Sequence, residues 1–177
     1  MQWVVFLRAV NVGGANRCQP ALIAKQLGKF GVVNIGAVGT FVVRETVSES
    51  ALRNAIAKKL PFKCEIMICP ARDIMKLASK DPFSEQPSAP NITRFVNILA
   101  KRLPSPPSLP ISLPSDSDWL LKVIGIENRF VVGLYRREMK AIGYLGKIEK
   151  LLGVPATTRN WNTMEKVAKI LRENSQD

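Results

Sequence analysis

The residues best suited to chemistry lie in the segment 155–165, which reads Pro-Ala-Thr-Thr-Arg-Asn-Trp-Asn-Thr-Met-Glu. Arg159 offers a planar fork of donors that fits a phosphate or a carboxylate, and Trp161 offers an aromatic face to a base, a sugar or a cation. Asn162, with a glutamate three residues later, has the pattern of a capping box and predicts a helix that starts near Thr163. The first N–H groups of a helix favour an anion, so the segment predicts an anion-binding site.

A structural role accounts for the same segment equally well. Trp161 could fill a gap in the core, Asn162 could cap the helix, and Asn160 could satisfy buried backbone groups. The sequence leaves both roles open.

The turn-rich segment 11–17 is the second candidate site. Gly13 and Gly14 permit positive φ and a close backbone approach, and successive N–H groups in such a turn can bind an anion. A plain tight turn, with Asn11 as a local hydrogen-bonding residue, is the alternative. Arg8 follows a predicted buried strand, so it is either an ion-paired core residue or a ligand contact. Our hypothesis is that this loop and the segment around Arg159 converge on one cleft.

The sequence contains no arrangement typical of a catalytic or metal centre. It has no histidine, which removes the most common general base. Three cysteines, an odd number, favour reduced thiols over a disulfide framework. Cys64 and Cys69 would point to opposite faces of a strand, so a shared metal is not expected. We predict no metal and no cofactor, and enzymatic activity stays open.

The composition is that of a globular protein with an excess of positive charge. The 177 residues are 46% hydrophobic, enough for one domain or two small ones. No apolar run approaches the roughly 18 residues of a membrane span, and no basic segment precedes the first apolar run, so we expect a cytoplasmic protein. The net charge of +12 makes nucleic acid or a nucleotide a candidate partner. The oligomeric state stays open.

The first half alternates strand and helix signals, separated by turns. The expected elements are a strand at 3–8, a helix at 20–30, strands at 32–35 and 40–44, a helix at 48–60, a strand at 64–69 and a short helix at 72–79. The order strand, helix, two strands, helix, strand is that of a ferredoxin-like unit. We therefore expect an α+β fold whose first subdomain covers residues 1–80.

The second half, residues 81–177, is predicted to form another α+β subdomain. The expected elements are strands at 93–100, 120–126 and 129–137, then helices at 145–152 and from 163 onward. The loop at 103–114 contains five prolines, which exclude a helix and a central strand there.

Two segments carry a resemblance to a known family. Leu7-Arg-Ala-Val-Asn-Val-Gly-Gly14 and Leu152-Gly-Val-Pro-Ala-Thr-Thr-Arg-Asn-Trp-Asn-Thr163 resemble the signature segments of domain-of-unknown-function family 1697. The spacing between them also fits, so the resemblance spans nearly the whole chain. It implies an α+β protein with a ferredoxin-like amino-terminal half and a related, less regular second half. It implies no established activity.

The chain departs from the family pattern at two places. Members usually carry Gln-Ser-Gly-Asn at the hairpin after the first helix, where this chain has Ala37-Val-Gly-Thr40. Members also tend to have Ser-Lys before the penultimate helix, where this chain has Ala141-Ile142, with Lys140 just outside this register. If these positions line a shared site, this protein has a changed ligand or has lost part of the family's function.

The leading hypothesis from the sequence is the binding of an anionic ligand, a nucleotide or nucleic acid, in a cleft between the Gly-Gly loop and the helix start. The expected ligand-binding residues are Arg8, Asn11, Gly13, Gly14, Arg159, Asn160, Trp161 and Asn162. The alternative is a small-molecule enzyme that acts on a phosphorylated or carboxylated substrate. A third possibility is a structural or oligomerisation protein.

Overall fold

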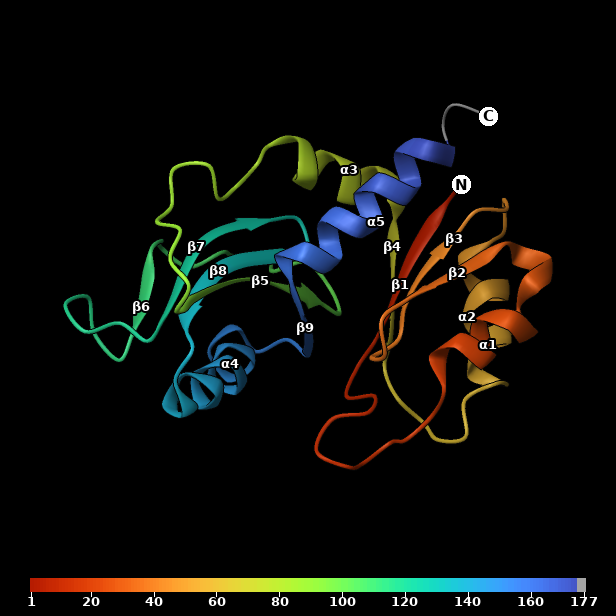
Figure 1. The fold of residues 1–177 in the computed structure, drawn as a ribbon, viewed down its shortest axis with the longest axis horizontal. Helices are drawn as coiled ribbons and strands as arrows, with labels where there is room; N and C mark the ends of the chain where they lie inside the picture. Colours follow the sequence, from red (N-terminus) through yellow and green to blue (C-terminus); the bar gives the residue numbers. More distant parts are fainter. Residues whose placement is uncertain (175–177) are drawn as a thin grey trace. The chain divides into compact units, whose positions relative to one another are not determined.

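The structure, a computed structural model, describes residues 1–174 and combines two antiparallel sheets with helices (Figure 1). The predicted α+β class is confirmed. The chain divides into two compact units, residues 1–79 together with the segment from Asn162 onward, and residues 80–161. The expected subdomains were 1–80 and 81–177, so the structure differs in grouping the last helix with the first unit.

The first unit is built on a four-stranded sheet in the order β2-β3-β1-β4, with all neighbours antiparallel. Its strands are β1 (Trp3–Leu7), β2 (Val32–Ile35), β3 (Thr40–Val43) and β4 (Ile66–Pro70). Its helices are α1 (Pro20–Gln26), the 3-10 helix η1 (Gly28–Phe30), α2 (Glu49–Ala57), α3 (Ala71–Ser79) and nearly all of α5 (Trp161–Asn174). Up to β4, the elements follow the order expected from the sequence.

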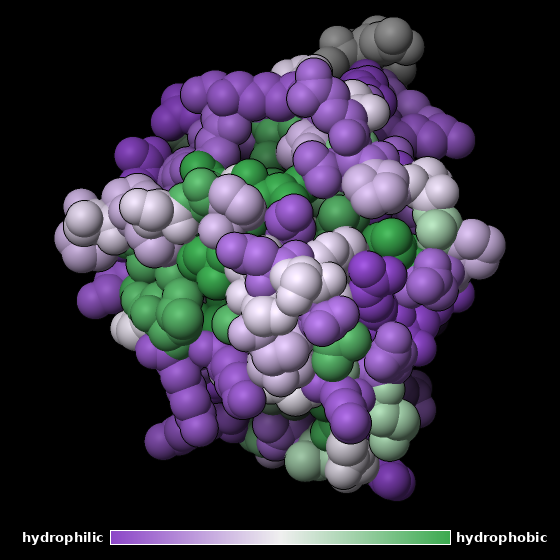
Figure 2. Space-filling view, turned by 90° about the vertical axis from the view of Figure 1, so that its left-hand side faces the viewer, coloured by the Kyte–Doolittle hydropathy of each residue, from purple (hydrophilic) through white to green (hydrophobic). Residues whose placement is uncertain are grey.

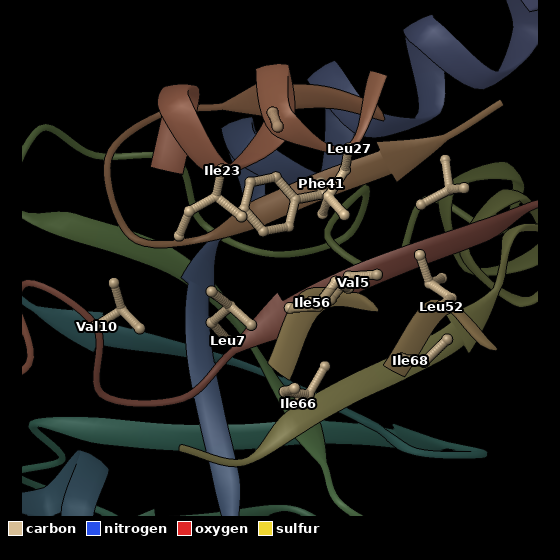
Figure 3. Packing of buried hydrophobic residues seen from close by; sticks show 12 residues of the cluster. Val5, Leu7, Val10, Ile23, Leu27, Phe41, Leu52, Ile56, Ile66 and Ile68 are labelled. Atoms are coloured by element: carbon tan, nitrogen blue, oxygen red, sulfur yellow. The ribbon is translucent and has the colours of Figure 1, made fainter. Parts of the chain in front are cut away.

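One face of this sheet packs against α1 and α2, which lie together on the same side in Figure 1. Figure 3 shows Ile23 of α1 and Leu27, the C-cap residue of that helix, close to Phe41 of β3. Ile56 of α2 lies near Val5 of β1 in the same cluster. The packing follows from the helical spacing of the apolar residues, because residues three and four apart share one face of a helix. Val10, which directly precedes the Gly-Gly loop, belongs to the same buried cluster, so the start of the loop is attached to this core.

The second unit contains a five-stranded antiparallel sheet in the order β6-β7-β8-β5-β9. The strands are β5 (Ile92–Leu99), β6 (Ile111–Leu113), β7 (Leu121–Glu127), β8 (Phe130–Arg136) and β9 (Ala156–Asn160), and α4 (Met139–Leu152) is the helix of this unit. β6 lies in the proline-rich segment and pairs only at the edge of the sheet. This agrees with the expectation that the prolines exclude a helix and a central strand.

The helix α4 covers one face of the second sheet. Ile148 of α4 belongs to a buried cluster with Phe95, Val123 and Val131 of the strands. Gly133 allows this packing, because a Cβ at that position would lie 2.6 Å from the Phe95 ring and 2.5 Å from a backbone oxygen. A side chain there would therefore force the ring or the strand to move.

Three predicted elements differ from the structure. The helix expected at 145–152 begins six residues earlier, at Met139. Gly143 weakens the helical signal of the missed residues, whereas the burial of Ala141 stabilises this end of the helix. The helix expected near Thr163 begins at Trp161, so Asn162 is its second residue and not its N-cap.

The third difference is β9, which the sequence analysis interpreted as a polar loop before a helix. The segment 156–160 alternates in burial and pairs antiparallel with β5, placing Ala156 opposite Leu99. The buried positions are a threonine and an arginine. The alternation of buried and exposed residues therefore does not show in the sequence as an alternation of apolar and polar residues. β9 runs directly into α5.

Candidate functional site

The second unit contains a pocket of about 490 Å³ beside the start of α4. Its lining combines charged, polar and apolar side chains, namely Thr93, Tyr135, Arg137, Glu138, Met139, Ile142 and Asn160. Pockets of roughly 300 to 1,000 Å³ bind small molecules. Figure 2, which views the side of the molecule where β6 lies in Figure 1, shows apolar groups exposed in patches between polar ones.

The register of the second sheet brings three of the lining residues together. Thr93 of β5 lies opposite Tyr135 of β8, and Phe95, two residues further along β5, lies opposite Asn160 of β9. Side chains alternate between the faces of a strand, so these residues project from one face. α4 packs on this face, because Phe95 and Ile148 belong to the same buried cluster. The pocket therefore lies on the α4 face of the sheet, beside the first turn of the helix.

Arg137 and Glu138 form the link between β8 and α4. The Nε atom of Arg137 donates a hydrogen bond of 3.1 Å to Oγ1 of Thr93, and its backbone N–H donates to the carbonyl of Asn91 at 2.8 Å. The first bond ties the guanidinium to β5, and the second ties the backbone of Arg137 to the residue that precedes β5. Since the side chain of Arg137 is exposed, its terminal amino groups can reach a ligand from solvent.

Glu138 occupies the N-cap position of α4, but its side chain makes no capping hydrogen bond. Its carbonyl accepts a hydrogen bond from the N–H of Ala141 at 3.0 Å. Within residues 1–174, no salt bridge joins Glu138 to Arg137. The pocket therefore contains a cationic and an anionic side chain that do not neutralise each other by direct contact.

The apolar part of the lining comes from the first turn of α4 and from β8. Met139 is 88% exposed and Ile142 is 61% exposed, although both are large hydrophobic residues. They are three positions apart, so they lie on one side of the helix. The ring of Tyr135 adds an aromatic surface with a hydroxyl group. This arrangement can hold an amphipathic small molecule, with a charged end at Arg137 and an apolar part on the helix.

The structure places Arg159 away from this lining. Arg159 is only 5% exposed, and its alternation with Asn160 along β9 directs it to the opposite face of the strand. One terminal nitrogen donates to Oγ1 of Thr157 at 2.8 Å and to the carbonyl of Thr158 at 2.9 Å. Burial lowers the pKa of the Arg159 guanidinium to about 10. These contacts favour the structural role among the two that the sequence left open.

Trp161 is likewise buried. Its ring meets Phe83 edge-on, with centroids 5.1 Å apart and planes at 64°. Asn162 is exposed at the start of α5. Of the four predicted residues in this segment, Asn160 is the one that lines the pocket.

The Gly-Gly loop lies in the first unit and is held by the side chain of Asn11. Its Nδ2 donates to the carbonyls of Cys18 and Ala37, at 2.9 and 2.7 Å, and its Oδ1 accepts from the N–H of Cys18 at 3.0 Å. Gly13 and Gly14 both have positive φ, and the N–H of the next residue bonds back to Val12, as in a type I′ turn. This geometry supports the turn interpretation of Asn11 and leaves the two glycines exposed.

Arg8 lies immediately after β1, and its backbone N–H donates to the carbonyl of Glu65 at 3.0 Å. Its side chain is partly buried and has interaction partners. The predicted convergence of the Gly-Gly loop and the Arg159 segment on one cleft stays a prediction.

The two positions that depart from the expected family pattern lie at the Gly-Gly loop and at the pocket. The Ala37–Thr40 turn contacts the Gly-Gly loop through the hydrogen bond from Asn11 to Ala37. The Ala141-Ile142 pair lies in the first turn of α4, and Ile142 lines the pocket. If the resemblance holds at this position, the second departure falls on the pocket wall.

Of the seven pocket residues, sequence reasoning expected Asn160 to bind a ligand and noted Ile142 only as a departure from the family pattern; it missed the other five. The strands that carry Thr93 and Tyr135 were both predicted, but their pairing joins segments about forty residues apart. The link Arg137-Glu138 could have been noticed as two opposite charges at a strand end, had α4 been predicted from Met139.

The three cysteines are free. Burial raises the pKa of the Cys18 thiol. Burial also raises the pKa of Cys64, with smaller contributions from Cys18 and Glu65, against the lowering effect of a backbone hydrogen bond with Arg8. Among the described residues, no group of three or more Cys, Asp or Glu side chains could hold a metal ion. None of the helices in residues 1–174 has the length and apolar character needed to cross a membrane.

Comparison with known proteins gives a family and a fold. The model of the family described as "Protein of unknown function (DUF1697)" matches residues 1–111, which include the amino-terminal motif but not the segment around Arg159. No curated protein matches. The structure is similar to that of a conserved bacterial protein from Streptococcus pneumoniae, with a TM-score of 0.61 and 16% identity over 96% of this chain and 98% of the other. At that identity the likeness shows the fold alone.

Proposed function

The chain belongs to the family of proteins of unknown function DUF1697, and we propose that it binds a small molecule with an anionic group in the pocket of the second unit. The observation that carries the proposal is the position of Arg137. Its guanidinium lines a pocket of about 490 Å³ and is tied to β5 by the hydrogen bond to Thr93. Arginine presents paired donors to a carboxylate or phosphate, which gives both affinity and orientation.

The start of α4 adds to the preference for an anion. The first N–H groups of a helix carry a partial positive charge, and the Glu138 side chain does not cap them. The amide of Asn160 supplies a further polar group on the opposite strand. Asn160 is one of the ligand-binding residues expected from the sequence. In this proposal, β9 contributes to function by bringing Asn160 to the pocket.

A nucleotide or a carboxylated metabolite fits this description. Tyr135 offers an aromatic surface to a base or another planar group, and Met139 and Ile142 offer apolar contact. The Gly-Gly loop of the first unit, with Gly13 and Gly14 exposed, remains a second proposed contact for an anion. The proposal places this protein in the cytoplasm, because free thiols are typical of a reducing compartment.

One observation favours an enzyme as the second candidate. The carboxylate of Glu138 lies in the same pocket as the anion-binding Arg137, so a substrate fixed by the arginine would have a proton acceptor beside it. In that case, Glu138→Gln would abolish turnover of the bound substrate while its binding persists.

The proposal is tested by NMR titration of the ¹⁵N-labelled full chain with adenosine 5′-monophosphate and with 3-phenylpropanoate. We expect chemical-shift changes in residues 137–142 and at Thr93 and Asn160. Arg137→Gln should weaken binding roughly tenfold, since a hydrogen bond to a charged group contributes about 1.5 kcal/mol or more. Arg102→Gln is the matched control, because Arg102 is exposed in the same unit and is not part of the pocket lining. If neither anion shifts these residues, or if Arg137→Gln binds like wild type, the proposal fails.

A further inference from the structure

The pocket carries two opposite charges on consecutive residues, Arg137 and Glu138. Both side chains are exposed to solvent, and in the described chain they are not joined by a salt bridge. The Glu138 carboxylate is also not engaged as a helix cap. Both charges are therefore available to a ligand, and the formal charge of the lining sums to zero.

Among the anionic ligands that the proposed function allows, this balance favours one that also carries a positive group over a phosphate dianion such as that of a nucleotide. A phosphate dianion bound at Arg137 would also face the carboxylate of Glu138, and like charges at short range repel. A ligand with one negative and one positive group would instead form a favourable contact with each side chain. Complementary charges give specificity mainly because a ligand with the wrong charge meets a repulsive or unpaired side chain.

We infer that the pocket selects a zwitterion of the amino-acid type, with its carboxylate at Arg137, its ammonium group at Glu138 and its apolar side chain on Met139 and Ile142. The inference rests on the proposed function, because it specifies which anionic molecule the pocket takes.

The carboxylate end is the better defined of the two. The bond from Nε of Arg137 to Thr93 holds one edge of the guanidinium at β5, and the terminal amino groups form the edge that a carboxylate binds in a bidentate manner. The uncapped N–H groups of α4 begin two residues later. A carboxylate near both would be bound by the side chain and favoured by the helix end.

Three groups of the pocket have the chemistry to bind the ammonium group of the ligand. The carboxylate of Glu138 supplies the charge, the ring of Tyr135 can accept a cation on its face, and the amide oxygen of Asn160 can accept a hydrogen bond. An amine that lacks a carboxylate would lose the contact with Arg137, and a carboxylate that lacks an amine would leave Glu138 unmatched.

The remaining wall explains a preference for an apolar side chain. Met139 and Ile142 are among the large hydrophobic residues most exposed to solvent in residues 1–174. An apolar ligand group would cover surface that is otherwise exposed to water. Methionine adapts its shape to different partners, so we expect tolerance among large apolar side chains.

Isothermal titration of the full chain with L-phenylalanine, 3-phenylpropanoate and phenethylamine tests this inference. These probes share the phenyl group and carry both charges, the negative charge alone or the positive charge alone. We expect L-phenylalanine to bind about three- to tenfold more tightly than 3-phenylpropanoate, the gain of one partly exposed charged contact. Glu138→Gln should remove this advantage. The control Glu85→Gln, at an exposed glutamate of the same unit, should keep it.

The outcomes separate this inference from the proposed function. If 3-phenylpropanoate binds as tightly as L-phenylalanine, and Arg137→Gln weakens both, the pocket binds simple anions and the zwitterion inference is overturned. If 3-phenylpropanoate and L-phenylalanine both fail to bind while adenosine 5′-monophosphate shifts the pocket residues, the inference is overturned and the proposed function stands; if adenosine 5′-monophosphate fails as well, both fall together. If the advantage of L-phenylalanine persists in Glu138→Gln, the ammonium group lies elsewhere and the assignment to Glu138 is wrong.

Discussion

Replacing Thr158 by valine removes the hydroxyl group that ties β9 to β5. Oγ1 of Thr158 donates a hydrogen bond of 2.6 Å to Oδ1 of Asn97, which lies directly opposite on the neighbouring strand. Asn97 is only 1% exposed, whereas Thr158 is exposed to solvent. The two partners therefore differ in how easily water can replace the bond.

The expected loss of stability follows from the difference in exposure between Asn97 and Thr158. A buried acceptor that loses its donor costs about 1 to 3 kcal/mol. Water at the exposed Thr158 side can recover part of that loss, so we expect Thr158→Val to lower the free energy of unfolding by about 1 to 2 kcal/mol. Asn97→Leu should leave a hydroxyl that water can reach, and the double variant should show a coupling of about 1 kcal/mol.

Urea unfolding at 25 °C, followed by circular dichroism, measures these changes in the free energy of unfolding. They are obtained from the shift of the transition midpoint, with the slope of the transition unchanged. Thr158→Ser is the control, because it keeps the hydroxyl and should stay closer to wild type than the valine variant. If Thr158→Val unfolds within about 0.3 kcal/mol of wild type, or if the coupling with Asn97 is zero, the hydrogen bond does not hold β9 and the reasoning is refuted.

Three further predictions concern the residues that the sequence singled out. Arg159→Met should change the free energy of unfolding by about 1 kcal/mol or less in urea titrations, because the lost hydrogen bonds offset the desolvation that lowers the pKa of Arg159; a loss of pocket-ligand affinity in the folded variant would restore a binding role. Gly39→Ala should cost about 3 kcal/mol or more in the same assay, since its Cβ would lie 2.7 Å from the buried side chain of Leu7 at a φ of +79°. Gly13→Ala, at a φ of +60° with open space around it, should cost about 1 to 2 kcal/mol, and equal effects would contradict the steric argument. Fluorescence anisotropy with labelled single-stranded and duplex oligonucleotides should show binding that falls steeply with salt and is unchanged by Arg159→Met, as expected from a net charge of +12; binding that collapses in this variant would locate a nucleic-acid site at the motif.

The elements that were predicted correctly are those with strong local signals. The helix expected to open at Ser48 has that residue as its N-cap, with Oγ accepting from the N–H of Ala51 at 3.3 Å. Gly31 and Gly153, each next after the last residue of a predicted helix, adopt the left-handed conformation that ends a helix. These outcomes depend on a few neighbouring residues, which a sequence displays directly.

The elements that were predicted wrongly gain their stability from distant residues. The missed start of α4 contains Gly143, a poor helix former, and Ala141, which is fully buried, so its helical state depends on burial and not on propensity alone. β9 is a strand because it pairs with β5, about sixty residues earlier in the chain. A threonine and an arginine at its buried positions give no hydrophobic alternation to detect.

The sequence by itself determined the α+β class, the order of elements in the first half and the excess of positive charge, because each depends on composition or on residues close in the chain. Only the tertiary structure decided that Arg159 and Trp161 are buried and that Asn160 lines a pocket with Thr93 and Arg137. Pairing between β5, β8 and β9 sets those positions. Strand register places each side chain on one of two faces, and a register between segments far apart in the chain is settled only when the whole sheet has formed.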